Sequence, residues 1–466
     1  MQGNDTERDD PGALTRRLGL VSTTAIIVAE VIGAGIFLTP AGMARSLGSP
    51  FWLLAVWLAM AVITMSGAVC YGGLAARFPE AGGGYVYLRE AFGPRVGFLY
   101  GWMSALITDP GLTALFAVGM AGSLKDVAAL SSIGVRAIAV VAIAGLAVVN
   151  IAGVRSGATL LRGLTALKLL LLALIVVWGL GFGRGDWCNL LPLVARRPGS
   201  EPLSQALETG LVSAFFSFGG WWDAGKLAGE TKDPKRTIPR ALALGVMIVT
   251  AVYVLISLAF LYLVPTEKIE SDQAFASLAG TALFGSAGGQ VFAVVVAAVI
   301  LGCLAAMIMA APRVYFAMAL DGLFPNALSK IHPRLETPAR AIVLQAVLAS
   351  FLVVAGTFEQ ILAYFFFVTI AFLALTIAGV FVLDRRREGE RLGPLIPGYP
   401  LTPLVFLLPI AMLLVTLALR SPMQSSLGLL VVLLGLPAYQ VALRSGALKI
   451  AGRPGSIAEP SVDLGT

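Results

Sequence analysis

The stretch Gly33-Ala34-Gly35-Ile36-Phe37 interrupts an apolar, helix-length segment that runs from about residue 20 to 44, and it decides the fold. A second interruption, Phe218-Gly219-Gly220-Trp221-Trp222, lies in the segment from about 207 to 228. A helix broken at membrane depth leaves backbone N–H and C=O groups without water to bond, so such breaks persist where those groups line a cavity and hold a solute. Close packing through glycine is the alternative, but it favours G-x-x-x-G spacing. The matched pair predicts a transporter's binding site.

The composition agrees with a membrane location. Hydrophobic residues make up 58% of the 466 residues and charged residues only 13%, whereas soluble domains have about 25% charged residues. Runs long enough to cross a hydrocarbon core of about 30 Å lie at about 20–44, 50–75, 96–124, 133–151, 158–181, 207–228, 239–264, 287–318, 339–357, 359–383, 401–420 and 425–443. The sequence therefore predicts an all-α polytopic membrane protein of twelve transmembrane helices. Residues 1–19 and 444–466 are expected to be cytoplasmic tails, the second disordered after Gly452, and no cleavable signal peptide is expected.

The net charge of +7 is explained by topology. With the N-terminus inside, most of the 33 lysines and arginines fall in cytoplasmic segments, and Lys226 and Arg313 are counted with those segments. This positive-inside bias places both termini in the cytoplasm, in a cell membrane. A nucleic-acid partner is therefore not expected.

Enzyme and metal chemistry find little support. The three cysteines, Cys70, Cys188 and Cys303, allow at most one bridge, and His332 is the single histidine. That set offers no credible zinc site, and neither a hydrolase elbow nor an ATP-binding loop occurs. No cofactor or metal is expected.

Three connections combine turn residues with charge. One runs from Phe78 to Tyr85 and leads into a short helix that ends near Phe92-Gly93-Pro94. The second, residues 229–234, and the third, residues 385–400, are predicted to be solvated links.

Several stretches together resemble a known family. They are 31–37, 78–85, 215–221, Ala228-Gly229-Glu230 with Pro234 and Pro239-Arg240-Ala241-Leu242, 321–325 and 397–400. With these motifs in this order, the chain resembles an amino acid permease of the amino acid–polyamine–organocation superfamily, and within it the prokaryotic relatives of the L-type amino acid transporters. The resemblance implies a leucine-transporter-like fold with inverted repeats at about 20–181 and 207–383, followed by helices 11 and 12 at about 401–443.

The chemistry of the two breaks indicates the solute. The second half of helix 1 begins near Gly35 with unpaired N–H groups and the positive end of a helix dipole, which suit a carboxylate. The first half ends near Val31 with unpaired carbonyls, which suit an ammonium. Helix 6 repeats the arrangement, with carbonyls near Phe216 and Ser217. An α-amino acid carries both groups.

The predicted substrate-binding residues are Val31, Gly33, Ala34, Gly35, Ile36, Phe216, Ser217, Phe218 and Gly219. Small residues at the breaks and the lack of an acid in the helix 6 break favour a neutral amino acid. Phe216 and Phe218 are read as apolar walls or a gate, with packing or lipid-facing aromatics as the alternative.

Lys168 lies about ten residues from the cytoplasmic end of its helix, too deep for easy snorkelling. The family resemblance implies that this lysine takes the place of a sodium ion and bridges the helix 1 break to helix 8. From Ala287 to Leu320 the chain has no Ser or Thr, so hydroxyl ligands for a hard sodium ion are missing there.

Three acids in predicted spans are further candidates for coupling or gating. For Glu30 three roles are open: it changes protonation during transport, it pairs with Lys168, or it hydrogen-bonds within the bundle. Asp109 precedes a mid-helix proline and either borders the pocket or satisfies the distorted turn. Asp223 has Lys226 three residues later and is read as a local pair or inner-gate residue.

These observations predict a secondary transporter of neutral L-amino acids that works by sodium-independent exchange or facilitated transport. The alternative is a proton-coupled transporter of cationic amino acids or polyamines that uses Glu30 or Asp109. A membrane receptor or enzyme fits poorly. A covalent heavy-chain partner is not expected, because the loop from Lys125 to Arg136 has no cysteine.

Overall fold

The computed structural model describes residues 14–33, 35–181, 185–264, 280–281, 285–356, 358–386 and 396–444. Ala34, most of both tails and part of the 385–400 connection lie outside these ranges, so the predictions made for them are not addressed. Within the described ranges the regular structure is helical, apart from one parallel bridge between Leu18 and Thr231.

Helices fill the predicted spans in chain order. The first five spans hold α1 (Leu20–Val31) with α2 (Gly35–Leu47), α3 (Pro50–Arg77), α5 (Pro94–Met103) with η1 (Ser104–Thr108) and α6 (Asp109–Ser123), α7 (Ser132–Ile151), and α8 (Val154–Gly181). The short helix α4 (Gly84–Phe92) ends where the sequence predicts. Helix 1 is therefore broken between α1 and α2, as expected.

The next five spans repeat this pattern. They hold α9 (Leu203–Phe218) with η3 (Trp221–Glu230), α10 (Pro234–Leu263), α12 (Gly288–Ala310) with α13 (Pro312–Leu320), α14 (Ala339–Ala355), and α15 (Phe358–Arg385). The last two hold α16 (Leu401–Arg420), and α17 (Pro422–Leu433) with α18 (Gly435–Arg444). Short helical turns lie between spans at η2 (Trp187–Leu190), η5 (Gly285–Ala287) and η6 (Asn326–Ser329). The second break lies between α9 and η3, where Gly220 adopts a positive φ of 108°.

Nine helices in the described ranges are long and apolar enough to cross a membrane. Helix α1 and helix α14 are apolar but shorter. The broken helices fall below span length because each is divided in two, which is the expected result of an interruption at mid-depth.

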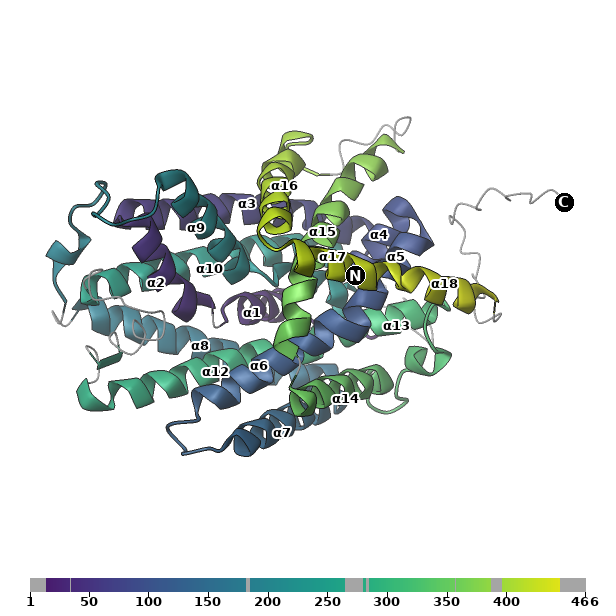
Figure 1. Ribbon diagram of the computed structural model, residues 1–466. Helices are drawn as coiled ribbons and strands as arrows, with labels where there is room; N and C mark the ends of the chain where they lie inside the picture. The colour runs from purple at the N-terminus through teal and green to yellow at the C-terminus, as the bar shows by residue number, and fades with distance from the viewer. Residues whose placement is uncertain are drawn as a thin grey trace, which may run out of the picture.

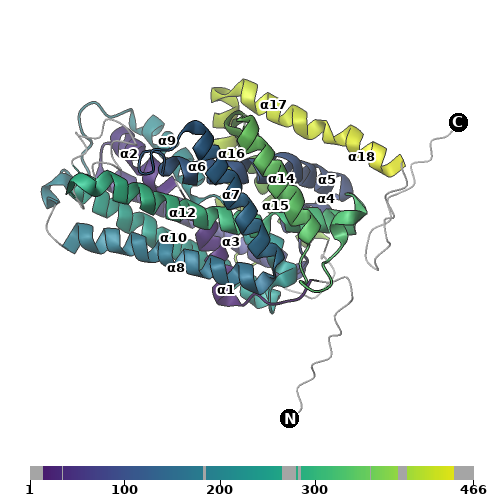
Figure 2. The same cartoon turned by 90° about the horizontal axis from the view of Figure 1, so that it is seen from below.

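Burial sorts the helices into an interior and a lipid-facing shell. Helix α1 lies inside the bundle and contacts α10, α8, α12 and η3 (Figure 1). About two thirds of the apolar window of the α12–α13 span is buried, against 28% for α7 and for α8. Helices α17 and α18 run along the outside (Figure 2). The exposed aliphatic side chains of the shell match a hydrocarbon solvent.

Two sequence interpretations are wrong in the structure. Lys226, counted with a cytoplasmic segment, is 2% exposed within η3. The connection at 229–234 is not uniformly solvated, because Glu230 and Thr231 are fully buried. In both places the helical turn η3 continues past the break and carries polar side chains inward.

Candidate functional site

The two breaks meet in space. A β-carbon at Gly35 would lie 2.8 Å from Ser217 Oγ and 3.0 Å from Ser217 Cα, so α2 and α9 touch backbone to backbone at this point. Ser217 Oγ is also 2.9 Å from Thr39 Oγ1. Gly219 and Gly220 follow at once, and Gly220 packs against Glu30 of α1. The contacts of Gly35 with Ser217 and of Gly220 with Glu30 therefore bring the two breaks together at one locus.

Tyr253 of α10 joins the two breaks, and sequence reasoning missed it. Its hydroxyl is 2.9 Å from Val31 O at the end of α1 and 2.6 Å from Ser217 O near the end of α9. Val31 O also accepts the backbone N–H of Gly33. Phe216 O accepts the N–H of Gly219 at 3.3 Å, so the carbonyls predicted to receive an ammonium all have a donor nearby in this conformation. A tyrosine in an apolar helix gives no sequence signal for such a role.

Lys168 of α8 supports the end of α1. Its Nζ donates to Ala29 O at 2.8 Å and to Ile32 O at 2.5 Å, and lies 3.5 Å from Cys303 Sγ of α12. The side chain is fully buried. A β-carbon at Gly302 would lie 3.0 Å from Lys168 Cε, so this glycine makes room for the lysine. The lysine therefore links the helix 1 break to α12, which fills the eighth predicted span. Its ammonium binds inside the bundle and does not snorkel to the membrane surface.

Asp109 and Asp223 share one lysine. Lys226 Nζ lies 3.1 Å from Asp109 Oδ1 and 3.0 Å from Asp223 Oδ1, and all three side chains are at most 5% exposed. The predicted pair between Asp223 and Lys226 is confirmed, and Asp109 joins it from α6. Ser104 Oγ donates to Asp109 Oδ2 at 2.6 Å. The π-helical turn η1 brings residues five apart onto one face, so Ser104 and Asp109 can pair within the distorted turn.

Glu30 has neither of the protein partners expected for it. The residue is 6% exposed, and both carboxyl oxygens lack a hydrogen-bond partner. Lys168 donates to backbone carbonyls instead, and no ion pair joins the two side chains in the described structure. Both residues lie next to the breaks, but Lys168 contacts the end of α1 and Glu30 packs against Gly220.

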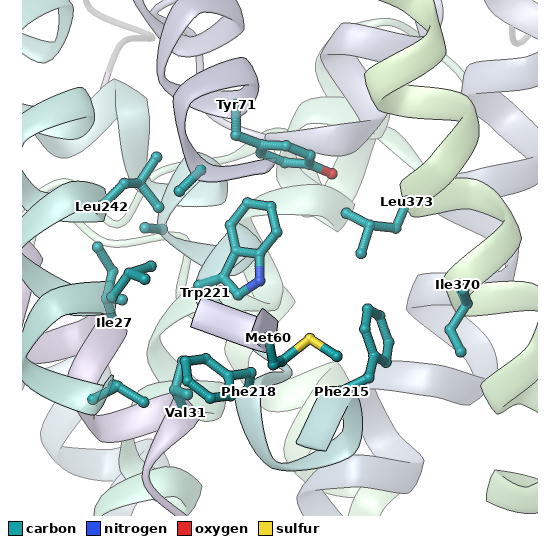
Figure 3. Packing of buried hydrophobic residues seen from close by; sticks show 14 of the residues in the cluster. Ile27, Val31, Met60, Tyr71, Phe215, Phe218, Trp221, Leu242, Ile370 and Leu373 are labelled. Atoms are coloured by element: carbon teal, nitrogen blue, oxygen red, sulfur yellow. The ribbon is translucent and has the colours of Figure 1, made fainter. Parts of the chain in front are cut away.

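The aromatic residues of the second break divide between interior and exterior. Phe218 is 1% exposed and packs against Trp57 and Tyr253. Phe216 is 48% exposed and lies near Phe366. Figure 3 shows the Trp221 indole surrounded by apolar side chains, with Tyr71 on one side and Phe218 on another. Phe218 and Trp221 are thus packed in the interior at the second break, while Phe216 is about half exposed.

One buried ion pair and several main-chain hydrogen bonds hold the end of the bundle beyond η3. Arg313 donates to both carboxyl oxygens of Glu230 at 2.9 Å, and this pair is almost fully buried. The N–H groups of Arg17 and Leu18 donate to Glu230 O at 2.8 Å. Lys232 N donates to Leu18 O at 2.8 Å. The start of α1 is thereby fixed to the end of η3.

Two motifs separated by more than two hundred residues also meet at this end. Tyr85 OH donates to Asp321 Oδ2 at 2.7 Å, and Arg89 pairs with the same carboxylate. Burial, together with the charge of Asp321, raises the pKa of Tyr85 well above its ordinary value. The phenol stays protonated and serves as a donor. The stretches 78–85 and 321–325 therefore act as one structural unit.

Glycine at position 35 is required by the close approach of α2 to α9. Gly35→Val should lower substrate binding at least tenfold, because the new side chain enters the space that Ser217 occupies. Binding to the detergent-purified protein measures this. Gly19→Ala is the matched control, since a β-carbon there meets no atom within 4 Å. Normal binding by the Gly35 variant would remove helix 1 from the site.

No group of three or more His, Cys, Asp or Glu side chains suited to a metal ion occurs among the residues that the structure places. The three cysteines are free, with Cys70 and Cys303 buried and Cys188 exposed.

A bundle of apolar helices with two broken helices meeting at a buried, lysine-supported locus defines a membrane solute transporter. The chain belongs to the amino acid permease family, whose model matches residues 18–436. It is therefore a multi-pass membrane transporter of the amino acid–polyamine–organocation superfamily and not an enzyme.

The chain is similar along most of its length to curated transporters. It is 29% identical to the "Serine/threonine exchanger SteT" of Bacillus subtilis (strain 168), over 92% of this chain and 97% of that protein. It is 30% identical to the "Large neutral amino acids transporter small subunit 2" of Homo sapiens, over 94% of this chain and 85% of that protein. The "b(0,+)-type amino acid transporter 1" of Oryctolagus cuniculus is 29% identical, over 83% of this chain and 80% of that protein.

Proposed function

We propose that this protein exchanges neutral L-amino acids across the cytoplasmic membrane by alternating access, without sodium. The observation that carries the proposal is the meeting of the two breaks at Gly35 and Ser217. Relatives described as a serine/threonine exchanger and as large neutral amino acid transporters support the substrate class and the exchange mode.

We propose the finer architecture on the same basis. Twelve transmembrane helices comprise an inverted repeat of five plus five helices, at about 20–181 and 207–383, followed by helices 11 and 12 at about 401–443. The break between α1 and α2 and the break between α9 and η3 occupy equivalent first positions, which supports the repeat. The charge bias places both termini in the cytoplasm.

The substrate carboxylate is assigned to the N-terminal N–H groups of α2, at Gly35 and Ile36, where the helix dipole favours an anion. The ammonium is assigned to carbonyls at the ends of α1 and α9. Val31 O and Ser217 O already contact Tyr253, so binding shares or displaces that hydroxyl. We assign the substrate side chain to the small residues Ser217 and Gly219, beside Phe218.

Sodium independence rests on Lys168. Its ammonium donates to two carbonyl oxygens at the end of α1 and approaches Cys303 of α12. A hard cation such as sodium would need oxygen ligands at this place. The described part of α12 and α13 has no hydroxyl side chains other than Tyr315. We propose no covalent heavy-chain partner, because the loop between α6 and α7 has no cysteine that could form a disulfide.

Ligands that lack either α-group should fail to compete for exchange into proteoliposomes. A charge-assisted hydrogen bond contributes about 1.5–3 kcal/mol, so decarboxylated amines and α-keto acids should compete roughly 10- to 100-fold more weakly than the parent amino acids. Alanine, serine, threonine and leucine should compete best. Stronger competition by lysine or putrescine would replace the neutral substrate with a cationic one, and absence of counterflow with every amino acid would contradict exchange itself.

A further inference from the structure

A buried cluster beside the breaks has more acids than bases. Asp109 of α6 and Asp223 of η3 pair with the ammonium group of Lys226, and Glu30 of α1 is close enough to interact electrostatically with all three. Lys226 lies within 3.1 Å of one oxygen of Asp109 and within 3.0 Å of one oxygen of Asp223. Those two carboxylates therefore have the lysine as their shared partner, and Glu30 is left without one.

Glu30 is buried, with 6% of its surface exposed. Its electrostatic neighbours are Asp223 and Lys226 of η3, Asp109 of α6 and Lys168 of α8, with Cys303 of α12 beyond Lys168. The two lysines are occupied, Lys226 by the aspartates and Lys168 by carbonyls of α1. Neither oxygen of Glu30 accepts a hydrogen bond.

The position of Glu30 ties it to the transport locus. It lies in the last turn of α1, three residues before Gly33. A β-carbon at Gly220 would lie 3.2 Å from Glu30 Cβ, so Glu30 packs directly against the second break. Any opening of either break changes the surroundings of this carboxyl group.

An ionised carboxylate that is buried without a partner is strongly disfavoured, and such a group takes up a proton instead. A cationic substrate side chain is the other ligand that would neutralise it. Lys226 already supplies the cation bound by the neighbouring acids, and Glu30 is only 6% exposed, which leaves little room for a substrate side chain beside it. The packing favours the smaller ligand.

We propose that Glu30 is a proton-binding site whose proton enters with the substrate when the breaks close around it. When the site opens to water, the carboxylate is hydrated and ionised. As the site closes, a hydronium ion transfers its proton to a carboxylate oxygen, and a water molecule is released. Opening to the other side returns the proton to water. This inference rests on the proposed amino acid site, but its test measures proton uptake on binding and not substrate transport.

Titration calorimetry on the purified protein tests it directly. The neutral amino acid that competes best among alanine, serine, threonine and leucine is titrated in two buffers of different ionisation enthalpy. We expect the wild-type protein to take up close to one proton per bound substrate near neutral pH. Its dissociation constant should rise with pH, by up to tenfold per pH unit over roughly pH 5 to 8, because the bound state holds the extra proton.

Two variants separate Glu30 from other acids. Glu30→Gln should bind substrate with no linked proton and with an affinity that does not change with pH. Glu208→Gln, the same substitution in an acid that pairs with Arg420 on the surface, should keep the wild-type linkage.

Binding by the wild-type protein without proton uptake would overturn the proposal while leaving the exchange function intact. Proton uptake that persists in Glu30→Gln would move the site to another acid. Tighter binding of lysine or arginine than of neutral amino acids, with no proton taken up, would assign Glu30 to a substrate side chain. If the Gln variant does not fold, a wild-type count of zero protons still overturns the proposal, and Glu30→Met, a variant of similar length that cannot ionise, replaces Glu30→Gln in the comparison.

Discussion

Lys168→Ala should reduce exchange by about two orders of magnitude or more. The substitution removes the side-chain donor to Ala29 O and leaves Ile32 O with only the weak thiol donor Cys303 Sγ at 3.3 Å, and an unsatisfied buried group costs about 1–3 kcal/mol. The end of α1 would then lose its fixed position relative to α12. Counterflow of a labelled neutral amino acid in proteoliposomes, with and without sodium, measures the effect.

Lys168→Arg should rescue exchange poorly. The planar guanidinium is wider than an ammonium, and Gly302 leaves only enough space for the lysine stem. Lys330→Ala, which removes an exposed lysine, is the control and should exchange normally. Full sodium-independent activity in Lys168→Ala would show that the helix 1 break does not depend on this ammonium.

Arg313→Met should lower stability by roughly 3–5 kcal/mol, because it leaves the Glu230 carboxylate charged and buried without a partner. Glu230→Gln should also be destabilising. The double variant should be less destabilised than the sum of the two, since neither charge then remains unpaired. Thermal unfolding in detergent, followed by the fraction of monodisperse protein, measures the three changes.

The exposed pair of Arg420 and Glu208 provides the control for that cycle. Their side chains are 53% and 29% exposed, and surface pairs contribute about 0–1 kcal/mol. Arg420→Gln should therefore unfold close to the wild-type temperature. Additive effects of the Arg313 and Glu230 substitutions would mean that the two side chains stabilise the fold independently.

The helices and the two breaks could be predicted from the sequence because hydrophobic runs and glycine pairs are local signals. Lys168 could be predicted as well, since a lysine far from both ends of an apolar helix is costly unless it has a partner. The pairing of Asp223 with Lys226 follows from their three-residue spacing. These residues could be identified without knowing which helices are neighbours.

Residues whose roles depend on neighbouring helices were harder to recognise. Tyr253 is one tyrosine within an apolar run, and only the packing of α10 against α1 and α9 places its hydroxyl between two carbonyls. Lys226 follows the second break closely enough to resemble a loop residue, and the continuation of η3 buries it. Asp109 meets Ser104 because of the π-helical turn, which has no distinct residue pattern.

The tie between the start of α1 and the end of η3 has a mechanical consequence. The N–H groups of Arg17, Leu18 and Lys232 and the carbonyls of Leu18 and Glu230 make it entirely from main-chain atoms. It therefore does not depend on which side chains occupy these positions. We therefore expect α1 and η3 to move together as one rigid body. A solute that bends one of these helices at its break would then displace the other as well.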